Sequence, residues 1–149
     1  MITRLATESD IPRVIETRIA FANCISPVHN EKEYAQALDV FIREHFNDGS
    51  LMVMITEDDN VIVSMAMLCI TVQMPRPSLF IRKEGLVISM YTNPNYRRQG
   101  HAAHLLKQLF VEAKKIGVNV INLSYTDMGY PLYVSLGFKK KDKEMCLEL

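Results

Sequence analysis

The segment from Leu86 to Ile116 changes its hydrophobic period once, and this change constrains the fold more than any other feature. Leu86 to Tyr91 is a short, partly β-branched apolar run, which predicts a strand covered on both faces. Asn93-Pro94-Asn95 ends that strand, because proline cannot donate to a ladder. From Ala102 to Ile116 the apolar residues recur every three or four positions, which predicts one face of a helix.

The turn that joins this strand to this helix is basic and contains Gly100. The first turn of a helix has amide hydrogens without intrahelical partners, at the positive end of the helix dipole. Gly100 and the small Ala102 and Ala103 let a phosphate approach the backbone, and Arg97 and Arg98 add positive charge. The segment therefore predicts an anion site. A basic turn with one glycine is also typical of an ordinary helix start with solvated arginines.

The other elements follow from periodicity and turn chemistry. Toward the N-terminus we expect a strand at 2–5, a helix at 11–22 that begins with Thr7 and Asp10 as caps, a helix at 31–47, strands at 51–56 and 61–73, and a loop at 74–84. After the long helix we expect a strand at 118–124, a short helix that starts near 128–130, and a closing strand at 138–149. The strands at each end of the long helix should be parallel neighbours. The order β-α-α-β-β-β-α-β-α-β predicts an α/β fold with a mixed sheet, in a single domain over residues 1–149.

Composition excludes several classes of function. Lys plus Arg and Asp plus Glu both number 17, so no net field attracts nucleic acid or an anionic membrane. No apolar run reaches the ~18 residues of a membrane span, and no secretory leader precedes the first strand, so we expect a cytoplasmic protein. Cys24, Cys69 and Cys146 are odd in number and widely spaced, so we expect reduced and mostly buried thiols.

Two motifs resemble one known family. Arg97-Arg98-Gln99-Gly100-His101-Ala102 matches the Gln/Arg-x-x-Gly-x-Gly/Ala signature of the GNAT acetyltransferases, the GCN5-related N-acetyltransferases. Downstream, the segment from Leu132 to Phe138 resembles the Leu-Tyr-x-x-x-Gly-Phe segment near the end of that family. The expected element order is also the GNAT order, in which two parallel strands splay apart and the pantetheine arm of the cofactor lies between them.

The resemblance implies acetyl-CoA as cosubstrate and a set of residues that bind it. The backbones of Met90 and Thr92 would bond the pantetheine amides, whereas the alternative is that both are ordinary sheet residues. The basic turn would hold the pyrophosphate through main-chain amides, and Thr126 stands where many members have an asparagine that bonds the cofactor. The implied cofactor-binding residues are Met90, Tyr91, Thr92, Arg97, Arg98, Gln99, Gly100, His101, Ala102, Ala103 and Thr126.

Tyr133 is the candidate catalytic residue. Acyl transfer from a thioester to an amine expels a thiolate, which a phenol can protonate or stabilise. In the family, the tyrosine at this motif position is the general acid, and the alternative is a core tyrosine with a satisfied hydroxyl. No base is assigned, because Leu86 stands where some members have a glutamate. Glu84, His29 and Tyr91 remain candidates, as does a water chain.

These observations favour an acetyl-CoA-dependent N-acetyltransferase, an acyltransferase that acts by direct transfer on a primary amine of a small molecule or on an exposed amino group. The alternative is a catalytically silent acyl-CoA-binding module. The spacing of His45, His101 and His104 indicates no metal site. The acceptor loops at 26–30 and 74–84 carry no recognisable code, and the sequence leaves a homodimer open.

Overall fold

The computed structural model describes residues 1–141 and 143–149. Its elements, in chain order, are β1 (Ile2–Leu5), a 3₁₀ turn (Glu8–Asp10), α1 (Ile11–Ile25), α2 (Glu31–Asn47), β2 (Leu51–Asp58), β3 (Val61–Gln73), β4 (Arg82–Thr92), a 3₁₀ turn (Pro94–Tyr96), α3 (His101–Lys115), β5 (Val120–Leu123) and α4 (Tyr130–Ser135). Within these residues, no helix combines the length and the apolar character that crossing a membrane requires.

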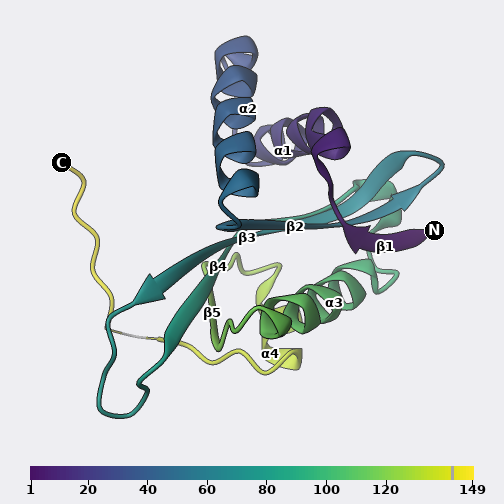
Figure 1. Ribbon diagram of the computed structural model, residues 1–149. Helices are drawn as coiled ribbons and strands as arrows, with labels where there is room; N and C mark the ends of the chain where they lie inside the picture. Colours follow the sequence, from purple (N-terminus) through teal and green to yellow (C-terminus); the bar gives the residue numbers. More distant parts are fainter. Residues whose placement is uncertain (142) are drawn as a thin grey trace.

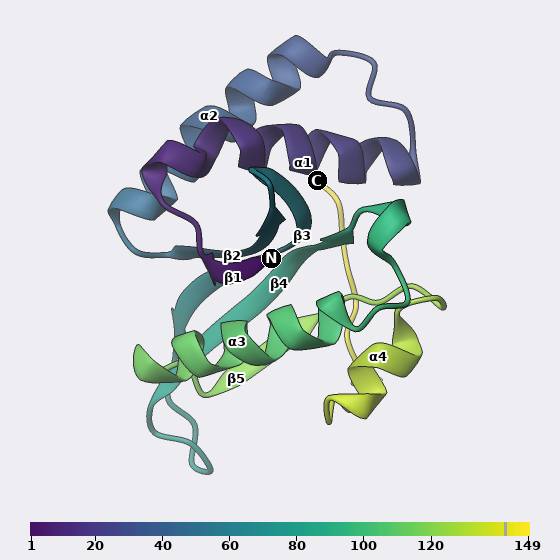
Figure 2. The ribbon, with the colours of Figure 1, turned by 90° about the vertical axis from the view of Figure 1, so that its right-hand side faces the viewer.

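The strands form one mixed sheet in the order β1-β2-β3-β4-β5. Neighbouring strands are antiparallel from β1 to β4, whereas β4 and β5 are parallel and α3 connects them. The predicted mixed α/β fold and the predicted parallel pair are therefore confirmed. Figure 1 shows α1 and α2 above the sheet and α3 and α4 below it, and Figure 2 shows the same two layers from the side.

Each face of the sheet has its own hydrophobic core. Between the sheet and the first two helices lie Ile11, Val14, Ile42, Leu51, Val53, Ile55, Ile62, Met65 and Met67. Between the sheet and the last two helices lie Met54, Ala66, Leu68, Ile70, Val87, Leu105, Leu106, Leu109, Ala113, Val118 and Tyr133. The alternation of side chains along β2 and β3 supplies both cores, because successive residues of a strand point to opposite faces.

A bulge in β4 and the early end of β5 create a gap in the sheet. Leu68 pairs with Val87 while Met67 pairs with Ser89, so Ile88 is the extra residue. β5 pairs with β4 only up to Val87 and Leu123. Beyond that pair, the rest of β4 still pairs with β3 along one edge. Along its other edge, it has no partner from β5 among the described residues.

Several predicted boundaries were wrong. α1 continues to Ile25, beyond its predicted end. β4 begins at Arg82, inside the predicted loop at 74–84, because this polar stretch pairs with the end of β3. Lys83 also donates to the Ile116 carbonyl at 2.8 Å, which anchors the start of the strand to the end of α3. Leu86 is 46% exposed, so the central strand is not covered on both faces along its whole length.

The predicted closing strand at 138–149 is wrong for the part that the structure describes, since residues 138–141 and 143–149 form no strand; Asp142 lies outside the described residues. Lys140 lies over the rings of Tyr125 and Tyr130, at 5.9 and 5.0 Å from their centroids. Residues 139–141 therefore lie beside these rings and form no ladder with β5.

The cysteine prediction was correct for oxidation state and wrong for burial. Cys24, Cys69 and Cys146 are all free thiols. Only Cys69 is partly buried, whereas the other two are exposed because they lie in the last turn of α1 and in the segment after α4.

Candidate cofactor-binding and active site

The turn after β4 is held together by hydrogen bonds to its own backbone. The Asn93 side chain accepts from the Asn95 amide at 3.1 Å, and Pro94 lies in the first position of the 3₁₀ turn that follows. Arg97 donates from Nε to the Thr92 carbonyl at 3.0 Å, and Gln99 donates from Nε2 to the Asn95 carbonyl at 3.4 Å. The basic turn is therefore fixed relative to the end of β4.

The N-terminus of α3 presents free backbone donors. Gly100 is the N-cap, with a left-handed φ of +83° that favours glycine, and the first intrahelical bond runs from the His104 amide to the Gly100 carbonyl at 3.0 Å. The amides of His101, Ala102 and Ala103 precede that bond, so they have no acceptor within the helix. A Cβ on Gly100 would meet no heavy atom within 4 Å, so the space above the turn is open. A diphosphate fits this arrangement of donors, charge and space.

Two residues of the signature differ in how they can contribute. Arg98 is exposed and has a φ of +62°, so its guanidinium projects from the turn into solvent. His101 is half-buried, its ring packs edge-on against Tyr96 at 6.2 Å, and its Nε2 is buried without a partner among the described residues. The backbone of His101, not its imidazole, is the part of this residue at the predicted phosphate site.

The residues that end β4 lie beside the gap between β4 and β5. Met90 packs toward α3, whereas Tyr91 is buried on the opposite face, edge-on to Phe21 at 6.2 Å. The Thr92 hydroxyl bonds the Ser64 hydroxyl at 2.9 Å. The backbone groups of Asn93 and Tyr91 face β3, so those of Met90 and Thr92 face the gap, where they have no ladder partner among the described residues and are available to a ligand.

Tyr133 is buried on α4, on the same side of the sheet as α3. Its side chain is 8% exposed and packs edge-on against Phe138 at 5.9 Å. A Cβ on Gly129 would lie 3.0 Å from Tyr133 Cε2, so the ring approaches the backbone closely at that position. Burial raises the pKa of the Tyr133 phenol, which keeps it neutral at pH 7.

Thr126 shapes the turn that leads into α4. Its hydroxyl accepts from the Gly129 amide at 3.2 Å, and its carbonyl accepts from the Gly129 and Tyr130 amides, both at 3.0 Å. Thr126 thus caps the backbone amides at the start of α4. The Thr126 hydroxyl keeps its own hydrogen available for donation.

The described contacts single out none of the three candidate bases. Glu84 accepts from Arg82 at 2.7 Å and from Asn122 at 3.4 Å, so its carboxylate is engaged. His29 is exposed in the loop between α1 and α2. Burial raises the pKa of Tyr91, which makes it a poorer base at neutral pH.

Sequence reasoning missed Ser89. This residue is 2% exposed and its hydroxyl is buried without a partner among the described residues. It follows the bulge in β4, beyond the last pair with β5. A single serine inside an otherwise apolar strand was the available signal, because a hydroxyl in such a run requires a partner.

The basic turn is not accompanied by a candidate metal centre in the part of the chain that the structure describes. Within the described residues, no group of three or more His, Cys, Asp or Glu side chains could hold a metal ion. The Lys139 to Lys141 run is exposed, on the side of the molecule that carries Tyr125 and Tyr130.

Comparison with known proteins agrees with this geometry. A predicted acetyltransferase from Clostridium acetobutylicum, solved with acetyl-CoA, is 26% identical with a TM-score of 0.82 over 99% of this chain and 95% of that chain. A GCN5-related N-acetyltransferase from Ralstonia eutropha is 21% identical, with a TM-score of 0.84 over 99% and 97%. An aminoglycoside 6'-N-acetyltransferase from Acinetobacter haemolyticus is 18% identical, with a TM-score of 0.76 over 100% and 98%.

Sequence comparison gives the family directly. Among curated protein sequences, none matches this chain. The family model described as the acetyltransferase (GNAT) family matches residues 16–138, which include both motifs. The chain therefore belongs to the GNAT family of acetyltransferases.

Proposed function

We propose that this chain is an N-acetyltransferase that uses acetyl-CoA to acetylate a primary amine, either of a small molecule or of an exposed amino group. The observation that carries this proposal is the gap between β4 and β5, which ends at the open N-terminus of α3. One ligand that is extended at one end and anionic at the other satisfies both features. GNAT enzymes use acetyl-CoA, which has this shape.

The residues around the gap fit such a ligand from end to end. The backbones of Met90 and Thr92, on either side of Tyr91, offer donors and acceptors for the amides of the arm. The amides that follow Gly100 suit the diphosphate because the helix already holds them in place, so little entropy is lost on binding. We assign Thr126 to the cofactor as well, and the residues assigned to the diphosphate are Arg97, Arg98, Gln99, Gly100, His101, Ala102 and Ala103.

The buried phenol of Tyr133 supports direct transfer. Acetyl-CoA, when bound, supplies an acetyl group activated as a thioester. In the transfer, the amine nitrogen bonds the acetyl carbon, the carbon–sulfur bond breaks, the amine loses a proton and the departing thiolate gains one. Tyr133 is protonated at pH 7 and can donate to that sulfur. No cysteine lies in either motif, so a covalent acetyl-enzyme is not part of the proposal.

The test combines calorimetry with acetyl-CoA and a thiol-release assay over a panel of amines, amino acids and peptide N-termini. For an active acceptor, we expect Tyr133→Phe to lower kcat by about 10²-fold or more while the Kd for acetyl-CoA changes by less than about threefold. Tyr130→Phe is the matched control, because Tyr130 is on the same helix and 36% exposed, and it should keep full turnover.

The two ways in which the proposal can fail are distinct. If acetyl-CoA binds but no amine in the panel releases thiol, the chain is a silent acyl-CoA-binding module. If acetyl-CoA does not bind, the assignment of the basic turn to the diphosphate is wrong.

A further inference from the structure

Arg18 lies on the side of α1 that faces the sheet. It comes four positions after Val14, which is fully buried, and three before Phe21, which packs edge-on against Tyr91 of β4 at 6.2 Å. Residues three and four positions apart share one face of a helix, so Arg18 extends into the layer between α1 and the sheet and is half-buried there. A charge in such a layer requires a partner, because burial removes part of its hydration.

The charge of Arg18 has no acidic partner in its own chain. Its guanidinium carbon lies 5.1 Å from the ring centroid of Phe21 and 6.0 Å from that of Tyr34, and it makes no hydrogen bond or ion pair among the described residues. The two rings stabilise the charge but offer no oxygen atom to its five N–H groups. By contrast, the other arginines on the described helices and strands all pair with carboxylates, and these are Arg4, Arg13, Arg43 and Arg82.

A second polar side chain without a partner lies in the same layer. Ser89 pairs with Met67, which belongs to the core between the sheet and the first two helices, and opposed residues of antiparallel strands point to the same face. The Ser89 side chain therefore faces α1, where it is 2% exposed and its hydroxyl has no partner among the described residues. Since α1 packs against β3 and β4, one unsatisfied group from the helix and one from the strand border the same layer.

This layer opens to solvent along β4. Leu86 pairs with Cys69, which is two residues after Met67 and so on the same face of the sheet, and Leu86 is 46% exposed. Ile88 is half-buried, and Ser89 beyond it is closed off. An acceptor for the proposed transfer would enter on this face, because α3 and α4 cover the other face of the sheet (Figure 2).

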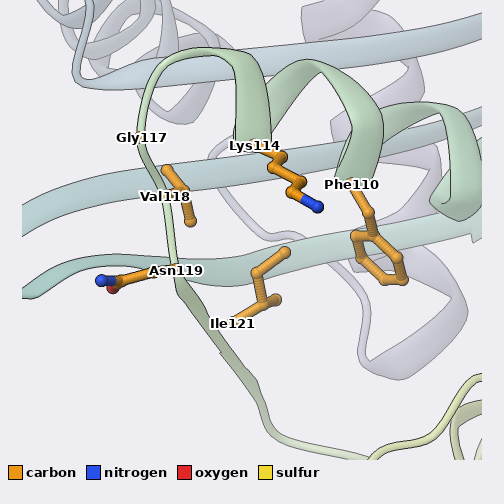
Figure 3. Close-up of a pocket in the computed structure, with 6 residues that line it drawn as sticks. All are labelled: Phe110, Lys114, Gly117, Val118, Asn119 and Ile121. Carbon is orange, nitrogen blue, oxygen red and sulfur yellow. The ribbon is translucent and has the colours of Figure 1, made fainter. Parts of the chain in front are cut away.

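The cavity on that other face offers no equivalent anion site. Its volume is about 470 Å³, and Figure 3 shows Phe110 and Lys114 reaching into it from α3, opposite Val118 and Ile121. Lys114 is exposed, so its ammonium group keeps its hydration and does not need an anionic partner. This lysine therefore serves as a control cation for Arg18.

We propose that the acceptor is an amine that also carries a carboxylate, as an amino acid does, and that Arg18 is the specificity residue that binds this carboxylate between α1 and β4. The proposal rests on the acetyltransferase function proposed above and names its substrate class. A guanidinium and a carboxylate form two parallel hydrogen bonds. One guanidinium also matches the single charge of a carboxylate better than the nearly two charges of a phosphate monoester. The Ser89 hydroxyl supplies a further hydrogen bond to the bound acceptor.

The first test compares acceptors that differ only in the carboxylate. Thiol release by the full chain is measured with each common L-amino acid and its carboxamide, and with β-alanine, γ-aminobutyrate and phosphoethanolamine. We expect the best acceptor to carry a carboxylate, and we expect its carboxamide to have a kcat/KM lower by about 10²-fold or more, because the amide leaves the guanidinium unpaired.

The matching change in the protein is Arg18→Met, which keeps the length of the side chain and its contact with the rings. It should raise KM for the carboxylated acceptor about 10²-fold, change kcat by less than about threefold, and leave turnover of the carboxamide as it is in the parent. Arg18→Lys should recover part of the loss, since it restores the charge without the fork. Lys114→Met removes one cation from the other face and should change KM by less than about twofold.

Calorimetry on the chain saturated with CoA separates this proposal from the proposed function, because CoA carries no acetyl group to transfer. The best carboxylated amine should bind at least about tenfold more weakly to Arg18→Met than to the parent, while both chains bind CoA equally. If it binds in this Arg18-dependent way but no thiol is released, the transferase function fails and the carboxylate site stands. If neutral amines are the best acceptors, or Arg18→Met leaves KM and binding unchanged, transfer stands and the carboxylate site is wrong. Binding of no carboxylated amine, or a preference for phosphoethanolamine, also overturns it.

Discussion

Arg97 Nε lies 3.0 Å from the carbonyl oxygen of Thr92, so one guanidinium ties the basic turn to the end of β4. The bond orders the turn before any ligand arrives, and it leaves the other guanidinium nitrogens free for an anion. A single side chain thus connects the strand that would bind the pantetheine arm with the turn that would bind the diphosphate.

Replacing Arg97 should weaken cofactor binding, because the change removes both the bond that orders the turn and a positive charge available to the diphosphate. For Arg97→Ala we expect the Kd for CoA to rise about tenfold, equivalent to ~1.4 kcal/mol, as measured by calorimetry. Lys107→Ala is the control, because Lys107 is an exposed cation on α3 beyond its first turn, and it should change the Kd by less than about twofold. Equal effects in the two variants would mean that only general charge matters.

Gly100→Ala separates backbone strain from loss of the phosphate site. Its φ of +83° costs an alanine about 1–2 kcal/mol of folding free energy, and the new methyl group would occupy the open space above the turn. We expect lower stability by urea unfolding and loss of CoA binding.

Gly49→Ala provides the matched control for Gly100→Ala. Gly49 has a φ of +75°, and a Cβ there also meets nothing within 4 Å, but it follows α2, far from the basic turn. This variant should lose similar stability and still bind CoA. If Gly100→Ala binds CoA as well as Gly49→Ala does, the diphosphate does not approach the backbone at that position.

Local sequence signals predicted the layers of the fold well. The helix at 31–47 and the strand at 61–73 have the bounds predicted from their periodicity, because each has a strong repeat and a clear end at Gly49 or Pro75. The start of β4 could not be predicted this way. Arg82, Lys83 and Glu84 have no strand period of their own and pair only because β3 and Asn119 present partners from elsewhere in the chain.

The candidate site likewise contains residues that local sequence predicts and one residue whose environment depends on distant parts of the chain. Gly100 and Tyr133 stand in motifs, and their left-handed backbone and burial are local consequences of their segments. The local pattern marks Ser89 only as a hydroxyl in an apolar run, because the lack of a partner for that hydroxyl depends on a bulge that forms only when β3 and β4 align. The failure of the closing strand has a similar origin, since two distant tyrosine rings hold Lys140.

Asp10 should govern the acid stability of the fold. Its carboxylate accepts from Arg4 at 2.7 and 2.9 Å and also from Arg13, and it is only 2% exposed. The arginines lower the pKa of Asp10, and Arg4 and Arg13 together lower that of Glu57. The resulting stabilisation is complete above the unfolded values near pH 4 and is lost as the pH falls through the lowered folded values.

We therefore expect Asp10→Asn to reduce the free energy of unfolding at pH 7 by about 2–3 kcal/mol, less than for a fully buried pair because the arginines are partly exposed. The difference from the parent chain should shrink as urea unfolding is repeated toward pH 3. Asp39→Asn removes an exposed pair with Arg43 and should behave like the parent. A difference that stays constant with pH would contradict the assigned linkage.

The pH profile of kcat tests the state of Tyr133. Burial raises the pKa of this phenol above its ordinary value of about 10, so the protonated form persists into alkaline solution. If Tyr133 donates to the leaving sulfur, kcat for an active acceptor should not fall between pH 7 and about 10. An alkaline decline within that range that disappears in Tyr133→Phe would show that the phenol ionises too early for this role.

Ser64 and Ser89 are two buried serines on neighbouring strands, at 0% and 2% exposure, with opposite hydrogen-bond states. The Ser64 hydroxyl lies 3.0 Å from the Tyr91 carbonyl and 2.9 Å from the Thr92 hydroxyl, whereas that of Ser89 has no partner among the described residues. Ser64→Ala should cost about 1 kcal/mol of unfolding free energy, and Ser89→Ala should cost nothing or raise stability, because an unsatisfied buried hydroxyl is itself unfavourable. Urea unfolding of both variants measures the contrast.

If Ser89→Ala loses as much stability as Ser64→Ala, the Ser89 hydroxyl has a partner in solution. If Ser89→Ala is stable but raises KM for the acceptor with kcat unchanged, its hydroxyl binds the substrate that enters beside the bulge.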